Sequence, residues 1–306
     1  MLNPGRLMVQ NAVQVFGDYE SKLKFGTVPR AQYGFCLYNA ARLANKLGYK
    51  HISAIEFGVA GGNGLVNLEF HAAQISKLVP IDIQIYGFDT GRGLPRPVDY
   101  RDLPYYWQEG FYKMDIETLK SRLTKAKLII GNISDTLGKF FQENEPAPVG
   151  AIAFDLDFYS STKDSLKILL AAEKYLMPRI FCYFDDTLGT EMELYNDFTG
   201  QRLAINEFNN ERQDIKLGVP YYLANLGISD AWWHQIWIAH IFNHSLYNKF
   251  VGGGQRQLPL SGCLRRHACW VRYVRRRVRA GRDQRPFGQF VMLVFVFSVS
   301  AASASA

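Results

Sequence analysis

A glycine-rich turn that follows a short apolar run constrains the fold of this chain more than any other feature of its sequence. Residues 52–57 are mostly apolar with β-branched members, which predicts a buried strand. Four glycines then interrupt the run, at Gly58, Gly61, Gly62 and Gly64. Residues 65–79 place apolar side chains on one face of a helix. Strand, glycine turn and helix are typical of a nucleotide-binding α/β unit, because glycine lets a ligand approach the backbone closely.

The spacing of the glycines excludes the dinucleotide fingerprint Gly-x-Gly-x-x-Gly. A frame that starts at Gly58 has Asn63 in its sixth position, and a frame that starts at Gly62 has Asn67 there. The residues do match acid-x-Gly-x-small-x-Gly, with Glu56, Gly58, Ala60 and Gly62. This pattern resembles the first motif of class I S-adenosylmethionine (SAM)-dependent methyltransferases, in which the turn accommodates the methionine part of the cofactor. These four residues are therefore candidate cofactor contacts, and a purely structural tight turn is the alternative.

Strand and helix patterns alternate along the chain. Strand patterns cover residues 52–60, 81–89, 127–133, 149–158 and 179–184, with weaker candidates at 215–224 and 235–240. Helical patterns cover residues 31–47, 65–79, 115–123, 134–141, 162–176 and 202–211. The alternation predicts a Rossmann-like α/β fold, with a mostly parallel seven-stranded sheet and helices on both faces.

An acid and an aromatic loop follow the second predicted strand. Ligands of parallel sheets bind outside the carboxyl ends of the strands, so Asp89 is a candidate to accept hydrogen bonds from both hydroxyls of a ribose. The alternative is that Asp89 caps a turn beside Gly91. Residues 95–111 then form a long, proline-broken loop with five aromatic side chains. We expect this loop either to cover an active site or to pack on the surface as an aromatic cluster.

Two pairs of acids follow strongly apolar runs. Asp155 and Asp157 end the fourth predicted strand, and Asp185 and Asp186 end the fifth. Neighbouring parallel strands would bring the four carboxylates to one edge of the sheet, where like charges require a cation or a bound proton. A cluster of oxygen ligands suits a hard divalent cation such as Mg²⁺ or Mn²⁺. The alternative is that Asp157 caps the helix after it and Asp186 caps a loop.

Three motifs give the chain a specific resemblance. They are Phe-Asp-Leu-Asp-Phe-Tyr-Ser-Ser-Thr at 154–162, Tyr-Phe-Asp-Asp at 183–186, and Gly-Phe-Asp-Thr-x-x-Gly-Leu-Pro at 87–95. Over residues 31–250 the sequence resembles the macrocin O-methyltransferase-type family of class I methyltransferases (macrolide and sugar O-methyltransferases). Members of that family methylate hydroxyls of sugars on macrolides and related natural products with SAM and Mg²⁺. The resemblance implies that Asp155, Asp185 and Asp186 bind the metal.

The resemblance also implies a mechanism. The metal binds the acceptor oxygen and lowers its pKa, a base removes the proton, and the oxygen attacks the methyl group of SAM in line while the protein supplies positioning. Asp155 is the candidate catalytic base, and a histidine near the C-terminal strand is the alternative. The candidates there are His234, His240 and His244, whereas His71 is expected to be packed or on the surface. The acceptor itself stays open between a sugar, a phenol and other hydroxyl compounds.

The formal net charge of +7 belongs to the C-terminal tail alone. From residue 255 onward the chain has ten Arg, no Lys and one acid, which leaves the first 254 residues with 25 basic and 27 acidic side chains, a net of −2. An apolar run at 290–299 is too short to span a membrane. Three readings compete for the tail: an Arg-rich arm for nucleic acid or anionic lipid, a weak membrane anchor, or a segment translated out of frame, which we favour.

The expected organisation is an N-terminal arm at residues 1–30, a methyltransferase domain at 31–250 and a poorly ordered tail at 251–306. The expected function is SAM-dependent, Mg²⁺-dependent O-methylation of a small molecule. A non-catalytic methyltransferase-like domain that binds a nucleotide or a partner is the alternative. We expect a cytoplasmic protein with a small-molecule acceptor and with neither nucleic acid nor membrane as partner, and we leave homo-oligomerisation open. Cys36 and Cys182 lie in apolar stretches and are expected to be buried free thiols.

Overall fold

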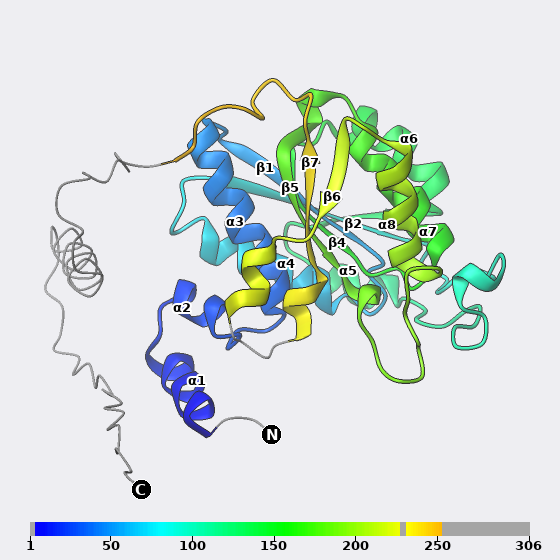
Figure 1. Ribbon diagram of the computed structural model, residues 1–306, viewed down its shortest axis with the longest axis horizontal. Helices are drawn as coiled ribbons and strands as arrows, with labels where there is room; N and C mark the ends of the chain where they lie inside the picture. Colours follow the sequence, from blue (N-terminus) through cyan, green and yellow to red (C-terminus); the bar gives the residue numbers. More distant parts are fainter. Residues whose placement is uncertain (1–3, 227–230, 253–306) are drawn as a thin grey trace, which may run out of the picture. The chain divides into compact units, whose positions relative to one another are not determined.

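The computed structural model describes residues 4–226 and 231–252, in which seven strands form one sheet of order β3-β2-β1-β4-β5-β7-β6 (Figure 1). The strands are β1 (His51–Phe57), β2 (Asp82–Asp89), β3 (Lys127–Ile130), β4 (Val149–Phe154), β5 (Leu176–Phe184), β6 (Ile215–Gly218) and β7 (Ile236–Ile241). β1 to β5 are parallel, and β7 is antiparallel to both β5 and β6. The predicted Rossmann-like α/β fold with a mostly parallel seven-stranded sheet is confirmed.

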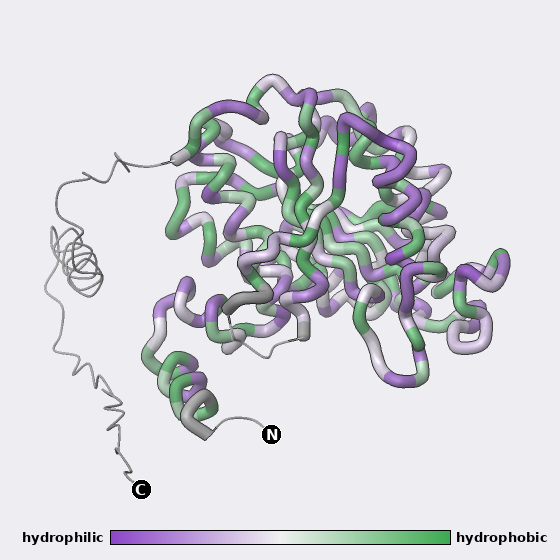
Figure 2. Tube along the Cα trace, in the orientation of Figure 1, coloured by the Kyte–Doolittle hydropathy of each residue, from purple (hydrophilic) through white to green (hydrophobic). Residues whose placement is uncertain are grey.

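Helices cover both faces of the sheet, and Figure 1 shows α3 and α4 on one side and α6, α7 and α8 on the other. The helices are α1 (Pro4–Phe16), α2 (Tyr19–Lys24), α3 (Ala31–Leu47), α4 (Asn63–Ile75), α5 (Ile116–Arg122), α6 (Ile133–Asn144), α7 (Tyr159–Ser165) and α8 (Gly200–Glu211). Every residue of β4 is buried, because a parallel strand in mid-sheet is covered from both sides. In Figure 2 the central strands accordingly carry mainly hydrophobic residues.

Four of the parallel strands carry a phenylalanine at or next to their carboxyl ends. Phe57 of β1 pairs with Phe88 of β2 and with Phe154 of β4, and Phe154 pairs with Phe184 of β5. Neighbouring ring centroids are 4.9 Å apart for Phe57–Phe88, 5.5 Å for Phe57–Phe154 and 4.3 Å for Phe154–Phe184. The four side chains are fully buried. This row of rings fixes the level at which the strands end, so the residues that follow the rings emerge together.

Several predicted strands end earlier in the structure than the apolar pattern suggested. β3 stops at Ile130 because Gly131 has a φ of 146° and Asn132 precedes α6. β4 stops at Phe154, and Asp157 takes a left-handed backbone with a φ of 59°. The predicted strand at 215–224 is only four residues long, and a 3₁₀ helix (Tyr221–Leu226) follows it. The apolar residues in these stretches lie in turns, and the periodicity of apolar residues alone cannot distinguish such a turn from a continued strand.

The predicted helix at 162–176 is also different in the structure. α7 begins at Tyr159 and continues as a 3₁₀ helix (Leu166–Leu170). The backbone is extended at Ala171, and a short 3₁₀ turn (Glu173–Tyr175) leads into β5. The helix prediction at 31–47 is confirmed to the residue, since Gly48, with a φ of 93°, ends α3 and donates its N–H to the last turn.

Two helices, α1 and α2, precede α3, where the sequence predicted an N-terminal arm. α2 packs on α3 through Leu23, which is buried against Gly34. The described residues up to Val251 belong to one compact unit. The Arg-rich and apolar segments of the tail, with Cys263 and Cys269, lie outside the described residues. Within the described ranges, no helix has the length and hydropathy to cross a bilayer.

Candidate active site

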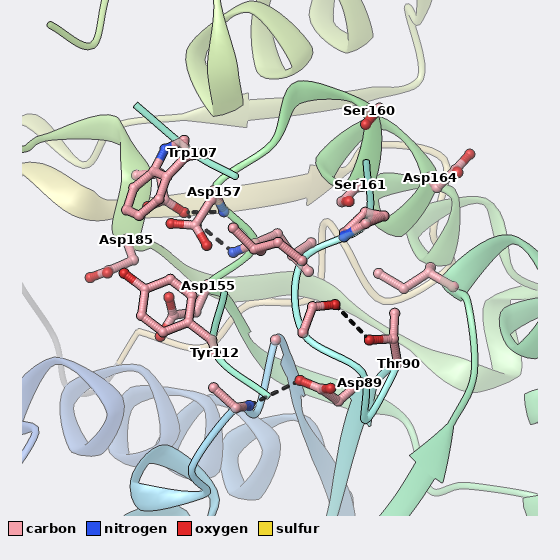
Figure 3. A pocket seen from close by; sticks show the side chains of 18 of the residues that line it. Asp89, Thr90, Trp107, Tyr112, Asp155, Asp157, Ser160, Ser161, Asp164 and Asp185 are labelled. Carbon is pink, nitrogen blue, oxygen red and sulfur yellow. Dashed lines mark hydrogen bonds between the residues drawn. The ribbon is translucent and has the colours of Figure 1, made fainter. Parts of the chain in front are cut away.

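A cavity of about 730 Å³ lies at the carboxyl ends of the parallel strands, where the sequence predicted a ligand site (Figure 3). Residues at the ends of β1, β2, β4 and β5 form its strand-borne wall: Gly58, Ala60, Asp89, Asp155, Asp157, Asp185 and Asp186. Connecting segments form its loop-borne wall: Leu94, Pro95, Trp107, Tyr112, Leu188 and Tyr195. The volume lies within the range of small-molecule sites.

The phenylalanine row explains how four of these residues come together. Gly58, Asp89, Asp155 and Asp185 each follow one of the four rings directly in sequence. Because the rings are in register across the sheet, the next residues leave the four strands at the same level. Gly58 and Asp155 approach so closely that a Cβ on Gly58, whose φ is 83°, would lie 1.6 Å from the Asp155 carbonyl oxygen. Only glycine fits at that position.

Asp89 holds the glycine turn through its carboxylate. Asp89 Oδ2 accepts hydrogen bonds from the backbone N–H groups of Val59 and Ala60, both at 2.9 Å, and Oδ1 accepts one from Gly91 at 2.6 Å. The contact with Gly91 confirms the alternative in which Asp89 caps that turn. The ribose contact remains a prediction, and the carboxylate lies on the cavity wall where such a contact requires it.

Glu56, a candidate cofactor contact, lies beneath the turn and does not line the cavity. Its Oε1 accepts a hydrogen bond from the Tyr33 hydroxyl at 2.8 Å, and its Oε2 has no partner among the described residues. Burial raises the pKa of Glu56 to about 8, so the side chain is mainly protonated at neutral pH. A Cβ on Gly64 would lie 1.7 Å from Oε1. Glu56 therefore supports the turn from the core side.

Gly62, the last candidate of the turn, faces α5. Its φ is 81°, and a Cβ there would lie 2.1 Å from a methyl carbon of Leu119. Arg122 of α5 also donates hydrogen bonds to the Gly61 carbonyl at 3.3 Å and to Asn63 Oδ1 at 3.0 Å. Of the four turn candidates, Gly58 and Ala60 line the cavity, whereas Gly62 and Glu56 hold the turn in place.

The four aspartates gather at the ends of β4 and β5, as Figure 3 shows for three of them. Burial raises the pKa of Asp155 well above its ordinary value, and repulsion from Asp185 and Asp186 raises it further. Burial and the charge of Asp186 raise the pKa of Asp157 to about 10, and burial and the charge of Asp185 raise that of Asp186 to about 7. In the absence of a cation these acids therefore retain protons, because several ionised carboxylates would repel one another in this buried site.

Asp186 braces the connection that follows β4. Its Oδ2 accepts the N–H groups of Asp157 at 2.8 Å and Leu156 at 3.3 Å, and its Oδ1 accepts the Tyr195 hydroxyl at 3.1 Å. Asp157 does not cap α7, contrary to one alternative, because Phe158 precedes the helix without a side-chain cap. The capping acid comes from the aromatic loop instead.

That capping acid is Asp102, which is fully buried. Its Oδ1 accepts the Ser160 N–H at 2.8 Å, and its Oδ2 accepts the Ser160 hydroxyl at 2.9 Å and the Val98 N–H at 2.8 Å. The loop thus binds the first turn of α7, and Leu103 and Trp107 pack on Phe158 in a small core of their own. The loop at 95–111 forms an aromatic cluster and also lines the cavity, and its role as the cover of an active site remains a prediction.

The aspartates offer an oxygen-only donor set for a hard divalent cation. A cation would relieve the repulsion among the ionised carboxylates, and Asp155, Asp185 and Asp186 would be its ligands. In the described conformation Asp185 accepts a hydrogen bond from the Tyr183 hydroxyl, and both oxygens of Asp186 have protein donors. Within the described part of the chain, no three His, Cys, Asp or Glu side chains are arranged to hold a metal ion. The donor chemistry fits Mg²⁺, and Mg²⁺ binding remains a proposal.

The strand-borne wall also fits SAM. Asp89 presents a carboxylate that can accept ribose hydroxyls, and Ile133 at the start of α6 presents an apolar surface between the polar residues Asn132 and Ser134, as a purine requires. Gly58 and Ala60 line the cavity together with Asp155, where the amino-acid part of the cofactor would lie. Asn132 and Ser134 were not predicted, because strand β3 was expected to run on to residue 133.

No histidine among the described residues lines the cavity. His71 is fully buried and bonded to the Tyr19 hydroxyl and the Pro29 carbonyl, and burial lowers its pKa to about 4. His240 contacts the Tyr247 hydroxyl, and His244 contacts the Leu176 carbonyl. Asp155 therefore remains the candidate base. The two cysteines Cys36 and Cys182 are free and buried, as predicted.

No protein-family model and no curated protein sequence matches the chain. Solved structures are similar in fold. CalS11, a calicheamicin methyltransferase, is 18% identical and aligns over 78% of this chain and 94% of its own length, with a TM-score of 0.48. The O-methyltransferase NovP is 15% identical over 59% of this chain and 72% of its own, with a TM-score of 0.43. The methyltransferase MycE, solved with Mg, SAH and mycinamycin VI, is 13% identical over 72% of this chain and 51% of its own, with a TM-score of 0.36.

These descriptions name methyltransferases, the class whose motifs the sequence resembles. Likeness at this level of identity carries no argument about the activity of this chain. The function therefore depends on the residues that line the cavity.

Proposed function

We propose that this protein is a SAM-dependent O-methyltransferase that acts on a hydroxyl of a small molecule, a sugar or a related natural product, with a divalent cation, Mg²⁺, at its aspartates. The observation that carries the proposal is the meeting of Gly58, Asp89, Asp155 and Asp185 at one end of the sheet in a single cavity. A ribose-binding acid, a close-approach glycine and a carboxylate cluster are the parts that such a reaction needs.

SAM and the acceptor would bind at different walls of the cavity. SAM would bind along the strand-borne wall, with its ribose at Asp89 and its amino-acid part beside Gly58 and Ala60. The acceptor would enter under the loop-borne wall, whose Trp107 and Tyr112 line the same cavity as Asp155 and Asp185 (Figure 3). When bound, SAM supplies an electrophilic methyl group, and Mg²⁺ lowers the pKa of a hydroxyl.

The protein's own groups then position the acceptor and take its proton. A carboxylate oxygen of Asp155 would take the hydroxyl proton, while Asp89, Gly58 and Ala60 would hold SAM, which would supply its sulfonium methyl group to the acceptor oxygen and leave as S-adenosylhomocysteine (SAH). Asp155 is suited to that role because its carboxylate lines the cavity at the end of β4, within the same space as the acceptor. Trp107 and Tyr195 line the cavity on the loop side, where they would shield the methyl donor from water.

Calorimetry with SAH tests the cofactor proposal and the metal proposal separately. We expect the protein to bind SAH, and we expect binding or turnover to respond to Mg²⁺ after treatment with EDTA. Absence of SAH binding would remove the methyltransferase proposal. Binding and turnover that are indifferent to EDTA would remove only the metal from it. A panel of sugars and phenols with a methyl-transfer readout then identifies the acceptor.

The substitution Asp155→Asn tests the role of the base. We expect turnover to fall by about 10²- to 10⁴-fold, the usual contribution of a positioned acid or base, while SAH affinity stays within a few fold. Asp164→Asn is the matched control, because Asp164 also lines the cavity but lies on α7, away from the ends of β4 and β5. Equal losses in both variants would mean that Asp155 has no special part in the reaction.

A further inference from the structure

A basic side chain from the segment ahead of α3 reaches the cavity. Arg30 lines the cavity together with Gly58 and Asp155. The only other basic residue on the wall, within the described ranges, is Arg96 of the aromatic loop. Residues 1–30 lie outside the region that carries the sequence motifs. Nothing in the methyl-transfer chemistry assigned above uses Arg30.

The guanidinium N–H groups of Arg30 are not used in hydrogen bonds among the described residues. Its guanidinium lies over the ring of Tyr33, 5.1 Å from the centroid, and its closest acidic atom is Asp155 Oδ2 at 3.8 Å. That separation is too long for a hydrogen bond. A guanidinium carries five N–H donors in a planar fork that matches a carboxylate. Within the described part of the chain, no side-chain hydrogen bond from Arg30 is formed, so its donors are available to a ligand.

Four backbone N–H groups of the glycine turn are already donated within the protein. The N–H groups of Val59 and Ala60 are donated to Asp89, that of Gly58 to the Phe88 carbonyl, and that of Gly62 to the Val59 carbonyl. In many nucleotide sites these groups would bind an anion. Arg30 therefore offers an anionic ligand group beside this turn donors that these four N–H groups do not.

The backbone fixes Arg30 in its place. Arg30 has a left-handed conformation with a φ of 43°, and its carbonyl accepts the N–H of Tyr33 at 2.9 Å. The preceding Pro29 carbonyl contacts His71 Nε2 at 2.9 Å, and the Tyr19 hydroxyl contacts His71 Nδ1 at 2.8 Å. His71 belongs to α4, the helix that follows the glycine turn. The segment that carries Arg30 and the turn are thus attached to the same helix.

We propose that Arg30 binds the α-carboxylate of SAM, so that the segment ahead of α3 completes the cofactor site. The proposal rests on the proposed function, because it concerns the orientation of SAM in that cavity. With the ribose at Asp89, the amino-acid part lies over Gly58, and its carboxylate comes within the reach of Arg30. Arg30 would also neutralise the negative charge that the carboxylate brings close to Asp155.

Two ligands that differ only in the amino-acid part test the contact by calorimetry. SAH carries the α-carboxylate, whereas 5′-methylthioadenosine keeps the adenosine and lacks the amino acid. For Arg30→Met, which keeps an apolar chain over Tyr33, we expect SAH to bind about 10- to 100-fold more weakly, the range of a charge-assisted hydrogen bond. We expect the affinity for methylthioadenosine to change less than twofold. Arg42→Met is the matched control, because Arg42 lies over the ring of Tyr38 at 5.4 Å and does not line the cavity.

The outcomes separate this proposal from the proposed function. Wild-type protein that binds neither ligand would overturn the proposed function. Wild-type protein that binds SAH, with Arg30→Met unchanged for SAH, would overturn the Arg30 contact alone. Equal weakening of SAH and methylthioadenosine would also overturn it, because Arg30 would then act on the site as a whole. Retained methylthioadenosine binding shows in the same experiment that the variant is folded.

Discussion

The two walls of the cavity are built in different ways. The strand-borne wall emerges from the main core, directly above the row of Phe57, Phe88, Phe154 and Phe184. The loop-borne wall has a separate small core around Leu103 and Trp107, and Asp102 attaches it to α7. A change in the first wall should therefore affect the stability of the whole unit. A change in the second should act locally and on the acceptor.

This difference is consistent with the proposed roles of the two walls. The strand-borne wall would hold the cofactor in a fixed position, and the loop-borne wall would adapt to the acceptor. Residues at strand ends keep their positions because the ladder of five parallel strands holds them. Loops have fewer buried apolar contacts, so they open at lower free energy and tolerate change. Four predictions measure this contrast, beginning with the largest expected effect.

Glu56→Gln should change the pH dependence of stability on the strand-borne side. The pKa of Glu56 is raised from 4.5 to about 8 by burial, so the folded state keeps a proton that the unfolded state loses. The stability of the wild type therefore falls as pH rises from about 4.5 to about 8. At about 1.4 kcal/mol per pKa unit, this amounts to on the order of 5 kcal/mol. Glutamine does not titrate, so the stability of Glu56→Gln should not show this decrease with pH.

Urea unfolding of the ligand-free wild type and variant at pH 5, 7 and 9 measures the effect. As pH rises, the free energy of unfolding of the wild type should fall relative to that of the variant. Other titrating groups, such as the buried His71, contribute to both proteins and cancel in the difference. Parallel pH curves would show that Glu56 is not held protonated beneath the turn.

Gly58→Ala should destabilise the whole unit. Its φ of 83° is unfavourable for alanine, and the new Cβ would lie 1.6 Å from the Asp155 carbonyl oxygen. Left-handed backbone and overpacking together cost about 2 to 5 kcal/mol. Gly61→Ala is the control, because nothing lies within 4 Å of its Cβ and the expected change is below about 0.5 kcal/mol. Equal unfolding midpoints for the two variants would mean that β1 and β4 do not approach each other as described.

The strand-borne wall was largely predictable from the sequence. Parallel strands had to bring Asp89, Asp155 and Asp185 to one edge, and spacing identified the turn at Gly58. A further signal was present and was not used: each of these residues follows a phenylalanine, as in Glu-Phe-Gly, Gly-Phe-Asp, Ala-Phe-Asp and Tyr-Phe-Asp. A repeated large residue at strand ends indicates that the strands end at a common level.

The loop-borne wall and the support beneath the turn were not predictable in the same way. The role of Asp102 depends on a contact 58 residues away in sequence, with Ser160, and no periodicity encodes it. Glu56 was assigned to the cofactor because its motif position matched, but strand alternation could not say that its side chain points into the core. Arg30 carries no motif, and only the packing of α2 and α3 places it in the cavity.

Asp102→Asn should loosen the loop-borne wall without weakening the sheet. Asparagine presents one acceptor oxygen where Asp102 accepts from Val98 and from both groups of Ser160. The loss of charge-assisted bonds should cost about 2 kcal/mol locally. Faster amide hydrogen exchange in residues 95–111, with unchanged exchange in β1 and β4, is the expected result. Asp99→Asn, at a half-exposed ion pair with Arg101, should change little, and faster exchange across the whole sheet would contradict the separate core.

Trp107→Phe should have the smallest effect and act on the acceptor alone. The indole Nε1 of Trp107 is buried in the cavity wall and has no hydrogen-bond partner among the described residues, so an acceptor oxygen is its expected partner. Phenylalanine keeps an aromatic ring and removes the donor, which should raise the acceptor KM about 5- to 10-fold, the equivalent of one hydrogen bond. SAH affinity should not change. Trp233→Phe is the control, since its Nε1 is equally without a described partner but lies away from the cavity. An unchanged acceptor KM in Trp107→Phe would mean that the acceptor does not bind at Trp107. It would contradict the proposal that the acceptor binds at the loop-borne wall and SAM at the strand-borne wall.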